Sequence, residues 1–448
     1  MKSIILSSNK SGGGKTTLTL GIMNSLIKKG FNVQPYKVGP DYIDTAFHSY
    51  ITGNKSRNLD IYLTGEDAVK QIYNESSLGK DLGIIEGVMG LYDGKGIDNM
   101  YSTAHVAKTL GIPVVLVISP KGQSITLCAE LNGIKNFDDI NIGGVILNNI
   151  TENYYKILKL AIEKHCNLKV FGYIPQDENI NIGSRHLGLI QSSEVHNLKE
   201  KIDYISDLVD KYIDLDMMLE VFKEINSSYI PLKAIEKRDI NISIAKDEAF
   251  SFYYEDNIEI LKKAGNVTFF SPLYDKNIPE DTDFLYIGGG YPEIFKDKLM
   301  ENSSIRESIK KALDSGLVCY AECGGLMYLC SSIENREMVG FLKGEAVMNK
   351  RLQNFGYAEL SIDKKNNLLP LGLTINCHEF HKSSVNISED KIYKLTKILY
   401  DDSTKIWQCG YMKNNTLGGY AHVHFYNNLD FIESLLNKAW DRKMVNSQ

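Results

Sequence analysis

The sequence has few cysteines and no long apolar run, and both features narrow the class of protein. Its seven cysteines are odd in number and contain no Cys-x-x-Cys pair. This argues against a disulfide framework or a zinc ribbon and favours a reduced cytoplasm. The most apolar stretch, 112–118, has the length of a strand, so we expect no membrane-spanning segment. The apolar run at 4–6 is too short for the core of a signal peptide.

The sequence also lacks an excess of positive charge. Its net charge is −6 and its pI about 5.9, which argues against a general nucleic-acid binder. Apolar residues make up 43% and charged residues 24% of the chain, as is typical of globular proteins. A chain of 448 residues exceeds one ordinary core, so two or three domains are expected.

Strand-like and helix-like segments alternate through the first half of the chain. Alternation of this kind predicts a mostly parallel sheet covered by helices on both faces. The expected strands are 3–8, 32–36, 82–86, 114–118, 144–148 and 169–174, and the expected first helix is 16–30.

The pattern loosens around 225–239, where we place a domain boundary. The expected domains are 1–230 and 240–448. The second domain begins a new α/β series, and the chain shows no internal repeat or low-complexity tract. Its expected elements are strand 240–245, helix 252–264, strands 267–270 and 284–287, helix 305–315 and strand 317–320.

A glycine-rich segment, Lys10-Ser-Gly-Gly-Gly-Lys-Thr-Thr17, follows the first expected strand. The pattern GxxxxGK[ST] lacks its first glycine, because position 9 is Asn, but its end is intact between a strand and a helix. Backbone N–H groups there can face phosphate oxygens, and the helix N-terminus adds positive potential. The expected ATP-binding residues are Lys10, Gly12, Gly13, Gly14, Lys15, Thr16 and Thr17. A turn without a ligand is the alternative, which the strand–loop–helix context disfavours.

Within this loop, Lys15 is expected to contact the β and γ phosphates, and the Thr16 hydroxyl to bind Mg²⁺. Charged residues follow the neighbouring strands, at the sheet edge where ligands of open α/β sheets bind. Lys37 can neutralise charge on a transferring phosphoryl group. Asp41, Asp44 and Glu86 offer the hard oxygen ligands that Mg²⁺ prefers.

Other residues of these segments are assigned to the acceptor substrate. They are Tyr42, in Gly39-Pro-Asp-Tyr42, and Asp93, in Tyr92-Asp-Gly94. Gly-Pro-Asp and Asp-Gly are also ordinary turn sequences, so structural roles for Asp41 and Asp93 stay open.

Cys323 follows an apolar strand and precedes two glycines and a helix-like run. Such an elbow exposes sulfur at a helix N-terminus, which favours the thiolate. An oxyanion formed by attack of this sulfur needs backbone N–H donors. Gly324 offers one, and the run Gly288-Gly289-Gly290, after strand 284–287, offers another, with Gly289 and Gly290 as the assigned residues. A helix is expected to begin at Gly290.

A histidine should act as the base for this cysteine, and His422 and His424 are candidates. Strand alternation would place both on one face. What orients His422 stays open between His424 and Glu322, and two purely structural histidines are the alternative. A phosphate loop and a reactive cysteine in one chain suggest that ATP activates a carboxylate while the cysteine releases ammonia from glutamine.

The segment Cys377-His-Glu-Phe-His381 has the residue types of a metal site. It lacks the His-Glu-x-x-His spacing that places two imidazoles on one helix face. We therefore expect a structural strand, or a wall of a pocket between the domains.

Several motifs, in order along nearly the whole chain, resemble the cobyrinic acid a,c-diamide synthase family. They are Gly12-Gly-Gly-Lys-Thr-Thr17, Val38-Gly-Pro-Asp-Tyr-Ile-Asp44, Arg57-Asn-Leu-Asp60, Glu86-Gly-Val-Met-Gly-Leu-Tyr-Asp-Gly94, Arg185-His-Leu-Gly-Leu189 and Glu322-Cys-Gly-Gly-Leu-Met-Tyr-Leu329. The second and fourth are the most specific.

The resemblance implies an α/β fold with two parts: an N-terminal P-loop domain like dethiobiotin synthetase and a C-terminal class I glutamine amidotransferase domain. It implies an ATP- and Mg²⁺-dependent ligase that amidates the a and c acetate carboxylates of cobyrinic acid through acyl phosphates, with glutamine as nitrogen donor. It also implies that Asn148 lies on the adenine side and that His422 is the catalytic histidine. The family pattern slightly favours Asp44 over Asp41 at the metal, and both stay candidates. The expected partners are these small molecules, with a possible homodimer.

Two alternatives stay open beside this resemblance. The first is amidation of another tetrapyrrole, such as a nickel sirohydrochlorin. The second is a partition-type ATPase switch, suggested by Lys10, which would bind DNA or a membrane and leave Cys323 and His422 unexplained.

Overall fold

The computed structural model describes residues 1–448 except 181–183, 186–187, 190–196, 226–227 and 447–448. It divides into two compact units, 1–61 with 65–231 and 62–64 with 232–448, and each is described by itself. Within the described residues, no helix combines the length and apolar character needed to cross a membrane.

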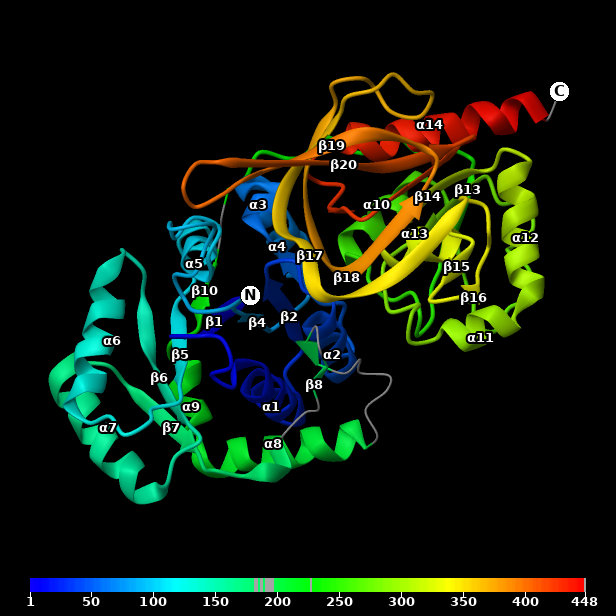
Figure 1. The fold of residues 1–448 in the computed structure, drawn as a ribbon. Coiled ribbons are helices and arrows are strands. Elements are labelled where there is room, and N and C mark those ends of the chain that lie inside the picture. The colour runs from blue at the N-terminus through cyan, green and yellow to red at the C-terminus, as the bar shows by residue number, and fades with distance from the viewer. Residues whose placement is uncertain (181–183, 186–187, 190–196, 226–227, 447–448) are drawn as a thin grey trace. The chain divides into compact units, whose positions relative to one another are not determined.

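The first unit is built on a parallel sheet with strand order β3-β2-β4-β1-β5-β6-β7 (Figure 1). Strand β10 pairs antiparallel with β1, and β8 and β9 form a separate pair. The strands are β1 (Lys2–Ser8), β2 (Val33–Val38), β3 (Arg57–Leu59), β4 (Leu82–Glu86), β5 (Val114–Ile118), β6 (Ile142–Asn148), β7 (Val170–Ile174), β8 (Ser184–Arg185), β9 (Gly188–Leu189) and β10 (Lys223–Glu224).

Helices cover this sheet, and its strands are buried because both faces are packed. Ile4 and Leu6 of β1 share a core cluster with Leu18 and Ile22 of α1. The helices of this unit are α1 (Lys15–Lys28), α2 (Ile43–Thr52), α4 (Glu66–Ser76), α5 (Thr103–Leu110), α6 (Ile125–Phe137), α7 (Glu152–Cys166), η1 (Glu178–Ile180), α8 (Leu198–Tyr212) and α9 (Leu215–Leu219). Helix α3 (Ile61–Thr64) has all but its first residue in the second unit.

The predicted parallel sheet of the first unit is confirmed. The strands expected at 82–86 and 114–118 coincide with β4 and β5, and the other expected strands differ only at their ends. Strand β2 continues to Val38, so Lys37 lies within it and not after it. Of the Arg185–Leu189 motif, residues 186–187 lie outside the described residues.

The second unit contains a mixed sheet with strand order β12-β11-β13-β14-β21-β20-β19-β17-β15-β16, and β18 pairs with β17 and β22. The pairs from β12 to β21 are parallel, whereas β17 to β20 pair antiparallel (Figure 1). The strands are β11 (Asn241–Ala245), β12 (Asn266–Phe270), β13 (Phe284–Ile287), β14 (Val318–Glu322), β15 (Ser332–Ile333), β16 (Arg336–Glu337), β17 (Gly344–Ile362), β18 (Thr374–Ile387), β19 (Asp390–Ile398), β20 (Thr404–Lys413), β21 (Thr416–Gly419) and β22 (His422–Val423).

The α/β series predicted for the second unit is present, with one helix wrongly placed. The helices are α10 (Glu255–Ala264), α11 (Lys296–Glu301), α12 (Ser303–Asp314), α13 (Gly324–Leu329) and α14 (Leu429–Asn446). The helix expected from Gly290 begins only at Lys296. Gly290 has φ +157, and the N–H of the next residue, Tyr291, donates to Ala249 O, so the chain turns there before it coils.

Two candidate active sites

The glycine-rich loop joins β1 to α1 and lines one end of a cavity. Gly14 caps the helix in the left-handed region, with φ +86, which favours glycine. A Cβ on Gly14 would lie 2.1 Å from Asn148 Nδ2. Asn148 Nδ2 in turn donates to Gly13 O at 3.1 Å, and Ser119 Oγ donates to the same oxygen at 3.0 Å. Asn148 therefore holds the loop in shape from the end of β6.

The cavity has a volume of about 720 Å³, which suits a ligand of nucleotide size. Lys10, Gly12, Gly14, Thr17 and Asn148 line it. The structure thus brings five of the predicted ATP-binding residues to one cavity.

Lys15 points away from solvent, and its Nζ donates to Met89 O at 2.5 Å and to Lys10 O at 3.3 Å. Burial and the nearby Lys37 cation lower the pKa of Lys15 to about 8, against opposing carboxylates. A bound phosphate would supply a negative partner and so stabilise the charged form of Lys15.

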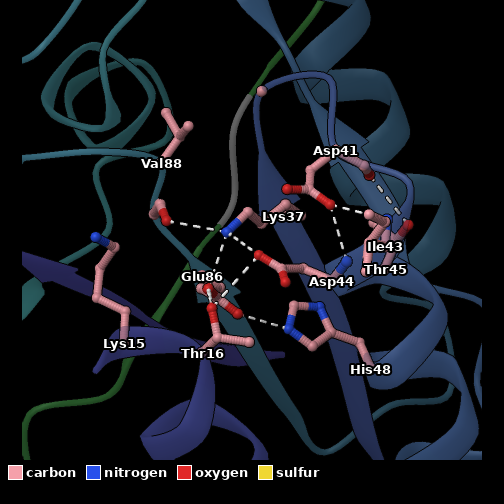
Figure 2. A network of polar contacts seen from close by, with 12 residues as sticks. Lys15, Thr16, Lys37, Asp41, Ile43, Asp44, Thr45, His48, Glu86 and Val88 are labelled. Carbon is pink, nitrogen blue, oxygen red and sulfur yellow. Dashed lines mark hydrogen bonds and ion pairs between the residues drawn. The ribbon is translucent and has the colours of Figure 1, made fainter. Parts of the chain in front are cut away.

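The buried side chains of Lys37, Asp44 and Glu86 form one polar network with the partly buried Thr16 (Figure 2). Lys37 Nζ lies 2.6 Å from Asp44 Oδ2 and 2.8 Å from Glu86 Oε1. The Thr16 hydroxyl donates to Glu86 Oε1 at 2.6 Å and lies 3.5 Å from Asp44 Oδ2. Four predicted residues, carried by β2, α2, β4 and the start of α1, thus lie together.

The charges of this network are strongly coupled. Burial opposes the charge of Lys37, but Asp44 and Glu86 outweigh it and raise the pKa of the lysine. Burial likewise opposes ionisation of Glu86, but Lys37 and His48 lower its pKa below the ordinary value. Burial and the Asp41 charge raise the pKa of Asp44. Two carboxylates and a hydroxyl around one point form an oxygen donor set that fits Mg²⁺.

The other predicted residues of this unit make local contacts. Asp41 Oδ1 accepts hydrogen bonds from the N–H groups of Ile43 and Asp44, at 2.9 and 2.8 Å, and so caps the start of α2. Tyr42 is partly buried beside it. Asp93 Oδ2 accepts from Gly90 N–H at 2.7 Å, which is the turn role left open from the sequence.

Sequence reasoning missed His48 and Asn58. His48 Nε2 lies 2.8 Å from Glu86 Oε2, and both side chains are fully buried. His48 follows Asp44 by one helical turn on α2, a spacing that places both on one face and could have revealed it. Asn58 Nδ2 donates to Gly39 O and Asp41 O at 2.8 and 2.9 Å, and so fixes the loop that carries the acidic residues.

In the second unit, Cys323 stands between β14 and α13. Its backbone has φ +48 and ψ −99, a strained conformation for a residue other than glycine. The Cys323 N–H donates to Gly419 O at 2.7 Å, which holds the turn against β21. This is the sharp elbow predicted from the sequence.

The predicted thiolate is not supported. Burial first, then the charges of Glu293 and Glu379, raise the pKa of the Cys323 thiol. Helix α13 has only six residues, and its N-terminus does not offset these effects. Burial thus favours the thiol over the thiolate at Cys323.

The glycines predicted for the oxyanion surround this elbow. A Cβ on Gly324 would lie 3.1 Å from Gly290 N, so the two backbones approach closely. Gly288 N–H donates to the Tyr253 hydroxyl at 2.8 Å, so this N–H already has an acceptor and does not serve the oxyanion. A Cβ on Gly289 would lie 2.6 Å from His422 Cε1.

His422 contacts a carboxylate, and His424 does not share its partners. Glu322 Oε2 lies 3.3 Å from His422 Nδ1. His424 lies outside β22, its Nε2 is 3.7 Å from Asp256 Oδ2, and its ring packs against Tyr254 at 4.8 Å. Of the two candidates for orienting His422, Glu322 is the one in contact with it.

The Cys377–His381 segment forms part of β18, as expected. His378 pairs with His422 across the strands, with ring centroids 5.0 Å apart. Among the described residues, no group of three or more His, Cys, Asp or Glu side chains could hold a metal ion.

Comparison with known proteins gives a family match for each part of the chain. Residues 4–190 match the CobQ/CobB/MinD/ParA nucleotide binding domain, and residues 241–429 match the CobB/CobQ-like glutamine amidotransferase domain. A cobyrinate a,c-diamide synthase of Clostridium tetani is 61% identical over 98% of this chain and 100% of its own length. The chain belongs to the cobyrinate a,c-diamide synthase family.

Further members of the family support this assignment. A Clostridium acetobutylicum cobyrinate a,c-diamide synthase is 56% identical over 97% of this chain and 100% of its own length. A cobyrinate a,c-diamide synthase of Listeria innocua is 42% identical over 96% of this chain and 97% of its own length. The predicted resemblance and the two-part α/β fold class are confirmed. The nucleotide-binding match implies ATP for the phosphate loop, and a partition-type ATPase would leave the amidotransferase match without a role.

Proposed function

We propose that this chain amidates the a and c acetate carboxylates of cobyrinic acid, using ATP and glutamine. The match to cobyrinate a,c-diamide synthases over nearly the full length of both proteins carries this proposal. We assign 1–230 to the ATP-dependent step and 240–448 to glutamine hydrolysis. Cytoplasmic location and a homodimer remain predictions.

In the ATP-dependent step, an oxygen of the acetate carboxylate attacks the γ-phosphorus of ATP, and ADP leaves. Ammonia then attacks the acyl carbon, and phosphate leaves with formation of the amide. Lys15 and Lys37 supply positive charge at the phosphoryl group as charge develops on it. Thr16, Asp44 and Glu86 would hold Mg²⁺, which would supply further charge neutralisation there.

Lys37 has a second role that follows from its contacts. Its ammonium group lies between two buried carboxylates and keeps both oriented toward Thr16. His48 contacts the remaining oxygen of Glu86. The chain thereby presents its oxygen ligands in place before a nucleotide binds, which lowers the cost of ordering the site.

In glutamine hydrolysis, His422 Nε2 accepts the proton of the Cys323 thiol as sulfur attacks the amide carbon. The oxyanion lies toward the N–H groups of Gly324 and of Gly289 or Gly290. His422 then gives its proton to the departing ammonia. Water cleaves the thioester, and glutamate leaves.

Mass spectrometry of cobyrinic acid incubated with the protein, Mg·ATP and glutamine tests the proposal. We expect two hydroxyl-to-amide conversions and then no further change. With Cys323→Ser we expect no product from glutamine but undiminished product from free ammonia, because the ATP-dependent step is untouched. An unchanged corrinoid with continued glutamine hydrolysis would instead favour another tetrapyrrole, such as a nickel sirohydrochlorin.

A further inference from the structure

The Cys377–His381 segment holds a buried ion pair that the mechanism above does not use. Glu379 Oε2 lies 3.1 Å from His381 Nε2, and the two side chains are 1% and 5% exposed. Glu379 Oε1 accepts a hydrogen bond from Trp407 Nε1 at 3.1 Å. The carboxylate is therefore held at both oxygens from strands β18 and β20.

The contacts of His381 require an extra proton. His381 Nδ1 lies 2.8 Å from the backbone oxygen of Ser383, which can only accept, so Nδ1 carries a hydrogen. The Nε2 contact with Glu379 then needs a second proton between ring and carboxylate. His381 Nε2 and Glu379 Oε2 therefore share one hydrogen, and burying polar groups of this kind costs desolvation free energy.

The pair lines a small cavity of about 140 Å³. Its other polar lining includes Gln353, Asn354 and Ser383. Cavities that take drug-sized ligands or macrocycles measure roughly 300–1,000 Å³. This cavity suits the charged head of a free amino acid.

Tyr420 connects the cavity to Cys323, the proposed nucleophile. The Tyr420 ring lines the cavity and stacks on the His381 ring, with centroids 3.8 Å apart and planes at 3°. The residue before it, Gly419, accepts the N–H of Cys323. Glu379 is also one of the charges that, after burial, raise the pKa of Cys323. A glutamine whose side-chain amide is at Cys323 would therefore have its α-carbon near this cavity.

We propose that Glu379 accepts a hydrogen bond from the α-ammonium group of glutamine and so selects the free amino acid as nitrogen donor. A carboxylate has about four acceptor positions, so Glu379 can bind an ammonium while keeping His381 and Trp407. His381 acts as the positioning residue, because its contacts with Glu379 and with the backbone oxygen of Ser383 fix the carboxylate before glutamine enters. The proposal rests on glutamine hydrolysis at Cys323 and names what recognises its substrate.

Glutaminase kinetics with two substrates test this proposal. The substrates are L-glutamine and 4-carbamoylbutanoate, which is glutamine without its α-amino group. We expect the wild-type full chain to lose about 10- to 100-fold in kcat/KM on the second substrate, the range of one charge-assisted hydrogen bond. Glu379→Gln should lose a similar factor on glutamine, mainly in KM, and then discriminate between the substrates by less than about 3-fold.

Glu379→Gln is a mild change, because an amide can still accept from Trp407 and donate to a neutral His381. Ammonia-dependent amidation should stay at the wild-type rate, which verifies folding. Glu359→Gln, which removes an exposed carboxylate from neighbouring strand β17, is the matched control and should keep full discrimination.

Two results would overturn the proposal. One is a Glu379→Gln variant that still discriminates as the wild type does, since Glu379 would then act only in folding or on Cys323. The other is equal kcat/KM of the wild type on L-glutamine and 4-carbamoylbutanoate. That result would show that no contact with the α-ammonium group contributes to catalysis.

Discussion

Glu322 Oε2 lies 3.3 Å from His422 Nδ1, and both side chains are 2% exposed. Glu322 is the last residue of β14, directly before Cys323, and β22 carries His422. A carboxylate at Nδ1 keeps the hydrogen on that nitrogen and leaves Nε2 to accept the thiol proton. In the proposed mechanism, one strand end thus supplies both the nucleophile, Cys323, and the group that orients its base.

Replacement of Glu322 should therefore impair glutamine hydrolysis more than replacement of His424. We expect Glu322→Gln to lower the glutaminase kcat by about 10²- to 10⁴-fold, because the amide can stabilise the wrong tautomer of His422. His424→Gln should cost less than about 10-fold, since its partners are Asp256 and Tyr254. Steady-state glutaminase assays measure both.

Ammonia-dependent amidation is the folding control for these two variants. A His424→Gln variant that keeps this activity but loses hydrolysis as strongly as Glu322→Gln would assign the orienting role to His424 instead.

The raised pKa of Cys323 sets the pH dependence of its chemical modification. The ordinary pKa of a cysteine is 9.0, and a raised value leaves less thiolate at every lower pH. We expect alkylation by iodoacetamide, without glutamine, to keep increasing about tenfold per pH unit beyond pH 9. Mass spectrometry of the Cys323 peptide gives the rate. A plateau below pH 8 would mean that the thiolate is preformed.

Much of the fold and of the nucleotide site could be predicted from the sequence, because those signals are local. A buried parallel strand is a short apolar run, so β4 and β5 were located to the residue. Lys37 lies near the end of β2, Glu86 ends β4 and Asp44 follows β2, and parallel strands bring such residues to one edge.

The remaining features depend on pairing between distant segments. The antiparallel strands β17 to β20 carry no strong local signal, and their register decides which residues line the cavity at Glu379. The Cys323 pKa was predicted in the wrong direction because a sequence motif shows the helix N-terminus but not the burial. The choice of Glu322 over His424 likewise needed the contact itself.

Binding of ATP should be coupled to proton uptake at Lys15. Its pKa is lowered to about 8, so the free protein is about half deprotonated there at pH 8. Phosphates favour the charged form and raise the pKa again, so binding should take up about half a proton at pH 8 and almost none at pH 6. Calorimetry of Mg·ATP binding in buffers of different ionisation enthalpy measures this number.

Lys15→Arg is the control for this measurement, since arginine stays charged at all these pH values. It should bind ATP without proton uptake. Equal uptake by the wild type and by Lys15→Arg would place the titrating group elsewhere.

Removal of the Lys37 cation should destabilise the protein, because Lys37→Met leaves Asp44 and Glu86 as two buried carboxylates without their shared partner. We expect the free energy of unfolding to fall by about 3–5 kcal/mol at pH 7.5, measured by urea denaturation. The loss should shrink as the pH falls, because protonated carboxyl groups no longer need a cation. In the wild type, Lys37 helps to lower the pKa of Glu86 below its ordinary value, so the stabilisation from this pair is present at neutral pH and is lost at low pH. Lys37→Met combined with Glu86→Gln should recover part of the stability at pH 7.5. A single variant as stable as the wild type would show that Asp44 and Glu86 do not depend on Lys37 in the folded protein.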